Sequence, residues 1–195
     1  MIVGLTGKKQ HGKSTVAQHL VENYGFVEMS FAAALKRFLA DLLDVPVELL
    51  NDEKERSKIL RPYGKSLRVI MQEFGTDYVR EKLHPDFWVL KVAGAYKRRK
   101  SSHPKGKPFN VVFSDVRFDN EAHAIRALDP GSKVIKVVKT DADGIPIDDS
   151  DTHASEKGVD FGILDCVFLA ETGDTGRLVQ LATDYLGLDD AGASE

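Results

Sequence analysis

The sequence contains one cysteine, Cys166, so the chain cannot form an internal disulfide, and a reducing compartment such as the cytoplasm is expected. It lacks any apolar stretch near the ~20 residues that a membrane-spanning helix requires. The N-terminal apolar run, residues 2–5, is too short for a signal peptide and has no basic residue before it. With 27 Lys and Arg against 30 Asp and Glu, the net charge is −3, which excludes a general positive field for nucleic acid. These absences lead us to expect a cytoplasmic globular chain with no membrane partner. Its length suits a single domain, 1–195.

Short apolar runs alternate with amphipathic segments along this chain. We expect five strands and six main helices: strands at 2–6, 26–31, 109–114, 134–138 and 164–169, and helices at 14–23, 32–43, 64–82, 85–99, 119–128 and 174–186. Strands that alternate with helices indicate parallel βαβ units. The sequence therefore predicts an α/β fold with a doubly wound, five-stranded parallel sheet.

Three stretches fall outside the regular alternation. The helices within about 30–100 follow one another without a strand, so we expect an inserted helical region rather than a separate domain. The polar segment from Thr140 to Asp160 is too long for a plain connection and is expected to be functional or mobile. The acidic tail, 188–195, is expected to be frayed.

Residues 7–14, with the sequence GKKQHGKS, match the phosphate-binding pattern G-x-x-x-x-G-K-[ST] in full. Gly7 and Gly12 let the backbone curl so that its N–H groups point at phosphate oxygens, and the following helix adds its positive end. Lys13 is placed to reach the β- and γ-phosphates, and Ser14 to offer a hydroxyl to Mg²⁺. This P-loop predicts ATP as phosphate donor and Mg²⁺ as cofactor. His11 occupies a variable position and is expected on the loop surface.

A carboxylate and a cation follow the third strand. Asp115 lies at the carboxyl end of that strand, where ligands bind in open α/β sheets, and can hold the Mg²⁺ shell or orient the attacking oxygen. The alternative is that it caps the next helix. Arg117 can grip an acceptor phosphate, unless it faces solvent. The chain has no N-K-x-D motif for guanine, so a kinase is favoured over a GTPase.

The helical region supplies candidates for the acceptor side. Helix 64–82 has an apolar stripe, with Arg68 and Gln72 on the opposite side; the stripe contains Leu67, Ile70, Met71, Phe74 and Tyr78. That polar side either forms a pocket or is solvated. Trp88 is either a core residue or a platform for a base. The basic run 97–100, with Lys105 and Lys107, is either a solvated loop or a nucleic-acid contact.

Taken together, these motifs resemble the phage deoxynucleoside monophosphate kinases, a branch of the nucleoside monophosphate kinase-like P-loop family. The resemblance covers about residues 1–186. It depends on the P-loop through Thr15, on Ser30-Phe31-Ala32 with Lys36, on 68–77, on Trp88, on 115–121, and on His153-Ala154-Ser155-Glu156.

The resemblance implies transfer of the ATP γ-phosphate to a deoxynucleoside monophosphate, in the host cytoplasm if the protein is phage-encoded. It implies catalysis by Lys13, Asp115 and Arg117, and Mg²⁺ binding by Ser14 and Asp115. ATP would contact Gly7, Lys8, His11, Gly12, Lys13, Ser14, Thr15 and Thr172. The acceptor would contact Lys36, Arg68, Gln72, Asp77, Trp88, Arg117, Glu121, Ser155 and Glu156.

The resemblance also implies a lid at about 140–158, and here the sequence departs from related kinases. They carry several arginines on the lid, whereas Thr140 to Asp160 contains none and has only Lys157. Arg126 or Lys157 supplies that charge, or Arg117 and Lys13 provide most of it.

The sequence leaves two alternatives to a deoxynucleotide kinase open: a kinase with another acceptor, and a binding module without much turnover. A homodimer is compatible with either. The acceptor could be dephospho-coenzyme A, because dephospho-coenzyme A kinase begins similarly, or a modified base within DNA. Nucleic acid is otherwise not an expected partner. A binding module that uses ATP to control a partner, with little turnover, is disfavoured by the pair of Asp115 and Arg117.

Overall fold

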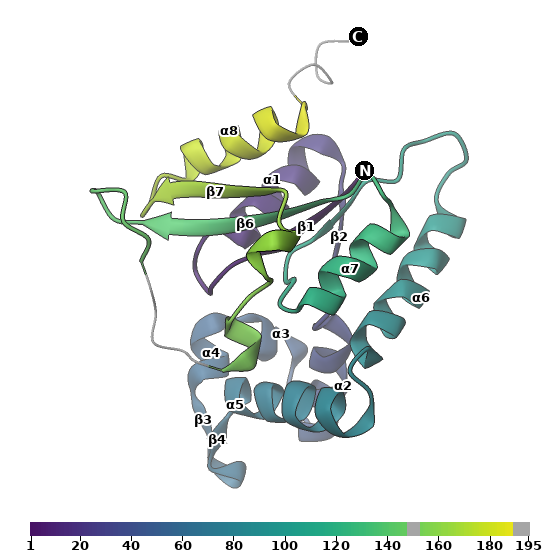
Figure 1. The fold of residues 1–195 in the computed structure, drawn as a ribbon. Helices are drawn as coiled ribbons and strands as arrows, with labels where there is room; N and C mark the ends of the chain where they lie inside the picture. Colours follow the sequence, from purple (N-terminus) through teal and green to yellow (C-terminus); the bar gives the residue numbers. More distant parts are fainter. Residues whose placement is uncertain (148–152, 189–195) are drawn as a thin grey trace.

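The computed structural model describes residues 1–147 and 153–188, and it contains the predicted five-stranded sheet (Figure 1). The strand order is β2-β5-β1-β6-β7, and every neighbouring pair is parallel. The strands are β1 (Ile2–Thr6), β2 (Val27–Met29), β5 (Val111–Phe113), β6 (Lys133–Thr140) and β7 (Cys166–Glu171). The α/β prediction is confirmed. The expected frayed tail and the middle of the expected lid lie outside the described residues.

Helices cover both faces of this sheet, which explains why its central strand is buried at every position. β1 is buried throughout and pairs with β5 on one side and β6 on the other. Helices α1 (Lys13–Tyr24) and α8 (Thr175–Leu186) pack on one face, and α6 (Phe87–Ser102) and α7 (Asp119–Leu128) on the other (Figure 1). The carboxyl ends of the strands therefore form an edge that neither helical layer covers, where parallel sheets bind ligands.

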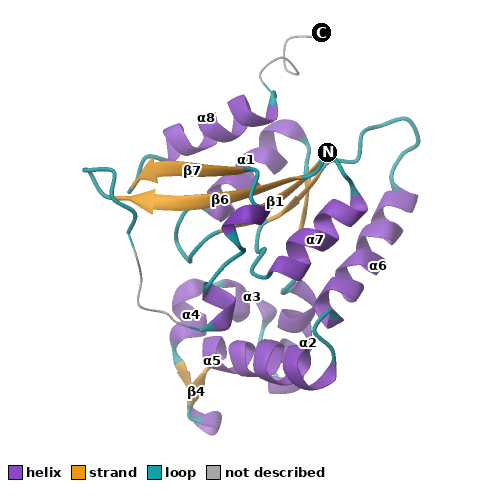
Figure 2. Ribbon diagram, in the orientation of Figure 1, coloured by secondary structure: helices purple, strands orange, loops and turns teal. Residues whose placement is uncertain are grey.

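The helical region between β2 and β5 forms a separate layer with its own apolar cluster (Figure 2). It begins with α2 (Ala33–Leu43), α3 (Val47–Asn51) and α4 (Glu53–Ser57), continues through a small hairpin of β3 (Ile59–Leu60) and β4 (Lys65–Ser66), and leads into α5 (Leu67–Gln72). The side chains of Leu39, Leu50 and Leu67 are buried in it. The prediction of an inserted helical region is confirmed.

One helix of this region differs from its prediction. The helix expected at 64–82 begins at Leu67, because Gly64 adopts a left-handed conformation (φ 63°) and the Ser66 hydroxyl accepts the N–H of Val69 as a cap. From Glu73 to Leu83 the chain is π-helical. The wider turn changes which residues face inward: Val79 is buried, whereas Tyr78, expected in the apolar stripe, is 52% exposed.

The segment expected to be one long polar loop contains regular structure in its described parts. β6 runs on to Thr140, which forms a bridge with Pro146 after a tight turn. Short 3₁₀ turns follow at Ala154–Glu156 and Phe161–Ile163. None of the helices within residues 1–147 and 153–188 is long and apolar enough to cross a membrane.

Candidate active site

The P-loop forms a closed cradle in front of β1. Gly7 and Gly12 have φ values of 128° and 96°, and a Cβ on Gly7 would lie 2.3 Å from the carbonyl oxygen of Val137. Only glycine fits at such a backbone approach. Lys13 folds into the loop, where its Nζ donates to the carbonyls of Gly7 (2.7 Å) and Lys8 (2.5 Å). This arrangement suits a phosphate group, because Lys13 is itself the first residue of α1 and the N-terminus of a helix favours an anion.

The ammonium group of Lys13 is buried, and its pKa is about 7. Desolvation is the main cause, and the positive charge of Arg117 lowers the pKa further; Glu156 and Asp115 act in the opposite direction. The charges of Arg117, Glu156 and Asp115 therefore lie close enough to Lys13 to shift its pKa.

The other predicted ATP contacts occupy different environments. His11 is buried and its Nδ1 accepts the N–H of Lys139 (3.3 Å), so its expected place on the loop surface is wrong. Ser14 is exposed at the start of α1, beside the half-buried Thr15. Thr172 lies just beyond β7, exposed, with its hydroxyl donating to the carbonyl of Thr140 (3.1 Å). ATP contact by each of them stays a prediction.

Asp115 ties the sheet to the helical region. Its carboxylate accepts hydrogen bonds from the Ser30 hydroxyl (2.6 Å) and from the backbone N–H groups of Phe31 (2.9 Å) and Ala32 (2.9 Å). These bonds order the turn that begins α2. The alternative that Asp115 caps the following helix is wrong, because α7 begins at Asp119 and its first N–H groups do not bond to Asp115.

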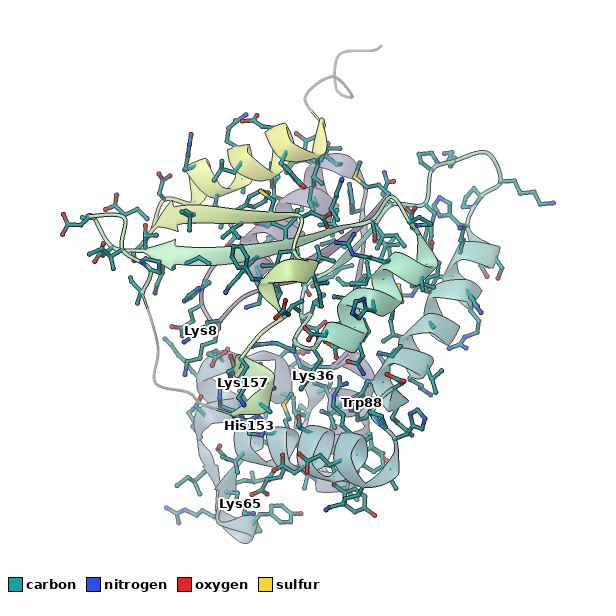
Figure 3. The ribbon with its side chains drawn as sticks, in the orientation of Figure 1. Lys8, Lys36, Lys65, Trp88, His153 and Lys157 are labelled. Carbon is teal, nitrogen blue, oxygen red and sulfur yellow. The ribbon has the colours of Figure 1, made fainter. Side chains whose placement is uncertain are left out.

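A cavity opens between the carboxyl edge of the sheet and the helical region. It brings together most of the residues expected at the acceptor: Lys36, Arg68, Gln72, Trp88, Arg117, Glu121, Ser155 and Glu156. Figure 3 shows Lys36 and Trp88 at this junction, and Lys65 away from it on the hairpin. Asp77 does not line the cavity; it is exposed, with Oδ1 3.4 Å from Nε2 of His153.

Arginines and glutamates alternate around this cavity. Glu156, which is buried, accepts from Arg117 (2.6 Å) and Arg68 (3.3 Å). Glu53 in turn pairs with Arg68 (2.9 Å) and with Arg56. The carboxylates hold three guanidinium groups in place before any phosphate binds.

Glu121 holds the backbone next to Arg117 in place. Its fully buried carboxylate pairs with Arg80 and accepts the backbone N–H groups of Arg117 (2.7 Å) and Phe118 (3.2 Å). Burial raises the pKa of Glu121 to about 7, although the charge of Arg80 acts against the rise. Glu121 therefore fixes the backbone that carries Arg117.

Trp88 combines the two roles that the sequence left open. Its side chain is buried in the apolar cluster of the helical region, and Nε1 donates to the carbonyl of Gly75 (2.9 Å). The ring also forms part of the cavity wall. The indole is thus held in place by its bond to Gly75, and contact with an acceptor base stays a prediction.

Arg56 lines the cavity and was not among the expected site residues. Arg56 stands in a short, highly charged helix, and such a helix normally indicates a solvated surface. The expected substitute, Arg126, is engaged elsewhere: it donates to the carbonyl of Ile163 (2.7 Å) and to Asp165 (2.9 Å). Arg56 is a further cation of the cavity, beside Arg68 and Arg117.

The donor set fits a magnesium ion held largely by water and phosphate. No cluster of three or more His, Cys, Asp or Glu suited to a metal occurs in the described part of the chain. Ser14 offers an exposed hydroxyl, and Oδ1 of Asp115 accepts one hydrogen bond where Oδ2 accepts two. Such a sparse protein contribution is usual for Mg²⁺ with nucleotides.

Comparison with known proteins identifies the family. The family model for deoxynucleotide monophosphate kinase matches residues 52–175. A "Putative deoxynucleotide monophosphate kinase" of Acanthamoeba polyphaga mimivirus is 34% identical over 165 residues, which cover 80% of each protein. Solved structures of a Janibacter sugar kinase (12% identity, TM-score 0.47, 100% of this chain and 98% of that one) and a Sinorhizobium meliloti gluconokinase (12%, 0.42, 95% and 90%) are distantly similar. The chain belongs to the deoxynucleotide monophosphate kinase family.

Proposed function

We propose that this kinase takes the γ-phosphate from ATP bound at the P-loop and transfers it to the phosphate of a deoxynucleoside monophosphate held in the adjoining cavity. The supporting observation is the place of Lys13. Arg117, Glu156, Asp115 and Arg56 all line the cavity, and their charges act on the pKa of Lys13, which supports a donor site that adjoins the acceptor cavity. The products would be dNDP and ADP.

The cavity has the charge and walls that a nucleotide needs. Arg56, Arg68 and Arg117 offer forked donors to the acceptor phosphate, with Lys36 beside them. Trp88 and Phe31 supply flat apolar surface for a base, and the amide of Gln72 can read its edge. The pKa of Lys36 is lowered, chiefly by burial, and a nearby anion would favour its charged form.

The chemical step needs positioning more than proton transfer. An oxygen of the acceptor phosphate attacks the γ-phosphorus in line, and the bond from that phosphorus to the β–γ bridging oxygen breaks, releasing ADP. The acceptor phosphate is already an anion near neutral pH, so no general base is required. Lys13, Arg117 and Arg56 offset the charge that spreads over the transferring group.

Magnesium would be held by Ser14 and, through water, by Asp115. When bound, it neutralises charge on the β- and γ-phosphates. Asp115 also orders the Ser30-Phe31-Ala32 turn, so the carboxylate connects the nucleotide site with the first helix of the acceptor region.

A coupled assay of ADP formation, run with each dNMP and each ribonucleotide NMP, tests the proposal. We expect ADP release that depends on at least one dNMP and is lost in Lys13→Ala. ATP hydrolysis that no monophosphate stimulates would contradict it. Activity with dephospho-coenzyme A or duplex DNA in place of dNMPs would move the acceptor to another class.

A further inference from the structure

A second hollow lies on the other side of α2, away from the active site. It is a groove between α2, α6 and the edge strand β2, and its floor includes Met29, Ala33, Ala34, Val92 and Ala95. None of its lining residues also lines the active-site cavity. The groove is therefore a separate site and not an extension of the first.

Four cations surround this groove: Arg37, Lys91, Arg98 and Arg99. Lys91 and Arg98 stand two turns apart on one side of α6, and Arg37 faces them from α2. The guanidinium of Arg98 lies over Gly94, 3.3 Å from where a Cβ would be. Because the whole chain carries a net charge of −3, this concentration of positive charge runs against the overall balance.

The cations of the groove have few counter-ions. Within residues 1–147 and 153–188, no carboxylate forms an ion pair with Arg37, Lys91 or Arg98. Arg99 donates only to the backbone carbonyl of Glu28 (3.2 Å), and the Glu28 carboxylate accepts the Ser114 hydroxyl. In the active site, by contrast, Arg56, Arg68 and Arg117 each have a glutamate.

We propose that this groove binds a nucleoside triphosphate, with its phosphates on Arg37, Lys91 and Arg98 and its flat base against the apolar floor. A polyphosphate chain supplies the negative charge that the groove lacks, and small side chains on the floor leave room for a ring. A long nucleic acid is a poorer match, because the chain is acidic overall and would repel a polyanion that extends beyond the groove.

The groove and the active-site cavity share one segment of the chain, so a ligand in the groove can influence the active site. Ser30 lines the groove and donates its hydroxyl to Asp115, while the next residues, Phe31 and Ala32, line the active-site cavity. Lys36 and Arg37 are neighbours on α2 that face the two sites separately. The start of α2 is thus a shared wall, and an occupant of the groove acts on the turn that Asp115 orders.

Equilibrium dialysis with labelled ATP, and separately with labelled dTTP, tests the proposal without depending on turnover. We expect the double variant Arg37→Ala/Arg98→Ala to bind one equivalent fewer of triphosphate than the unmodified chain, and the remaining equivalent to keep its affinity. The matched control is Lys105→Ala/Lys107→Ala, which removes the same charge from a loop outside the groove and should bind the full number.

Equal stoichiometry in the unmodified chain and the Arg37→Ala/Arg98→Ala variant would overturn the proposal. A single-stranded oligonucleotide that competes for the lost equivalent more tightly than either triphosphate would also overturn it, in favour of nucleic acid. The four cations are exposed side chains, so the variants are expected to fold; matching circular dichroism and thermal midpoints check this.

Discussion

Lys13 is the residue whose ionisation we expect to change when ATP binds. Its pKa of about 7 reflects burial first and the charge of Arg117 second, so near neutral pH a large share of the molecules hold it uncharged. The phosphates of ATP would favour the ammonium form and raise that pKa.

We therefore predict that each chain takes up close to one proton when it binds ATP at pH 8. This follows if binding raises the pKa of Lys13 from about 7 to well above 8. Because the complex holds more protons than the free chain, ATP affinity should fall as the pH rises above 7. Calorimetric titration in buffers of different ionisation enthalpy measures the uptake. Lys13→Met should remove it, and a binding enthalpy independent of the buffer would refute the prediction.

A second prediction at the scale of the residue concerns Arg56. Its Nε is buried and has no hydrogen-bond partner in the structure, while its other end pairs with Glu53 beside the cavity. A phosphate ligand would be bound more tightly by a guanidinium that is buried and has a hydrogen-bond donor without an acceptor.

We expect Arg56→Ala to lower kcat/KM for the dNMP by roughly 10- to 100-fold, the effect of losing about 1.5–3 kcal/mol of charge-assisted hydrogen bonding. ATP affinity, measured without acceptor, should change much less. Lys58→Ala is the matched control, since Lys58 ends the same helix but is exposed and pairs with Glu55. Equal losses in both variants would show that Arg56 has no specific role.

At the scale of the element, the π-helical segment Glu73–Leu83 places Gly75 against α2. A Cβ on Gly75 would lie 2.6 Å from Cδ2 of Leu35, and the carbonyl of Gly75 holds Nε1 of Trp88. We predict that Gly75→Ala lowers the free energy of unfolding by about 1–3 kcal/mol, as overpacking does in a well-filled core. Urea unfolding at fixed pH measures the change.

Gly94→Ala provides the comparison. Gly94 lies inside α6, and its added Cβ would meet only the far end of the flexible Arg98 side chain. Because alanine favours a helix over glycine by about 1 kcal/mol, this variant should be as stable as the unmodified chain or more so. If both variants were equally destabilised, close packing at Gly75 would not be the cause.

The sequence predicts helices and strands well where the spacing of apolar residues is constant. It fails where that spacing changes within one element. Helix 119–128 and strand 2–6 agree with α7 and β1 at both ends, because their patterns are uninterrupted. The π-helical segment uses a wider turn than the 3.6-residue pattern assumes, so Tyr78 was expected inside and Val79 takes its place. No local signal in the sequence marks that change.

The site shows the same division. The P-loop follows from a local motif, and Asp115 from the end of a strand, so both could be placed from the sequence. Arg56 becomes a cavity residue only because α4 packs beside α5, which allows Glu53 to join Arg56 and Arg68. His11 is buried only because β6 continues beyond its expected end and supplies the N–H of Lys139. Long-range packing decides both, and it leaves no pattern in the local sequence.

At the scale of the whole molecule, the helical region and the sheet have separate apolar clusters. Polar contacts join them at the active site: Arg80 with Glu121, Arg68 with Glu156, and Asn120 with Asp86 (2.8 Å). Substrates that bind among these contacts can draw the two layers together, because packed layers with separate cores move as units.

We predict that hydrogen exchange resolves the two layers. Amides of the part that packs least deeply, α3 through β4 (47–66), should exchange much faster than those of β1 and β5 in the free chain, since few of its side chains are buried. A bisubstrate analogue that links adenosine to the accepted deoxynucleoside through five phosphates should slow exchange in 47–66, where Arg56 lies, and leave β1 unchanged. Arg56→Ala should reduce that protection, and Lys58→Ala should keep it. Uniform slowing across both layers would instead mean that the analogue stabilises the fold as a whole and that the helical region does not close as a unit.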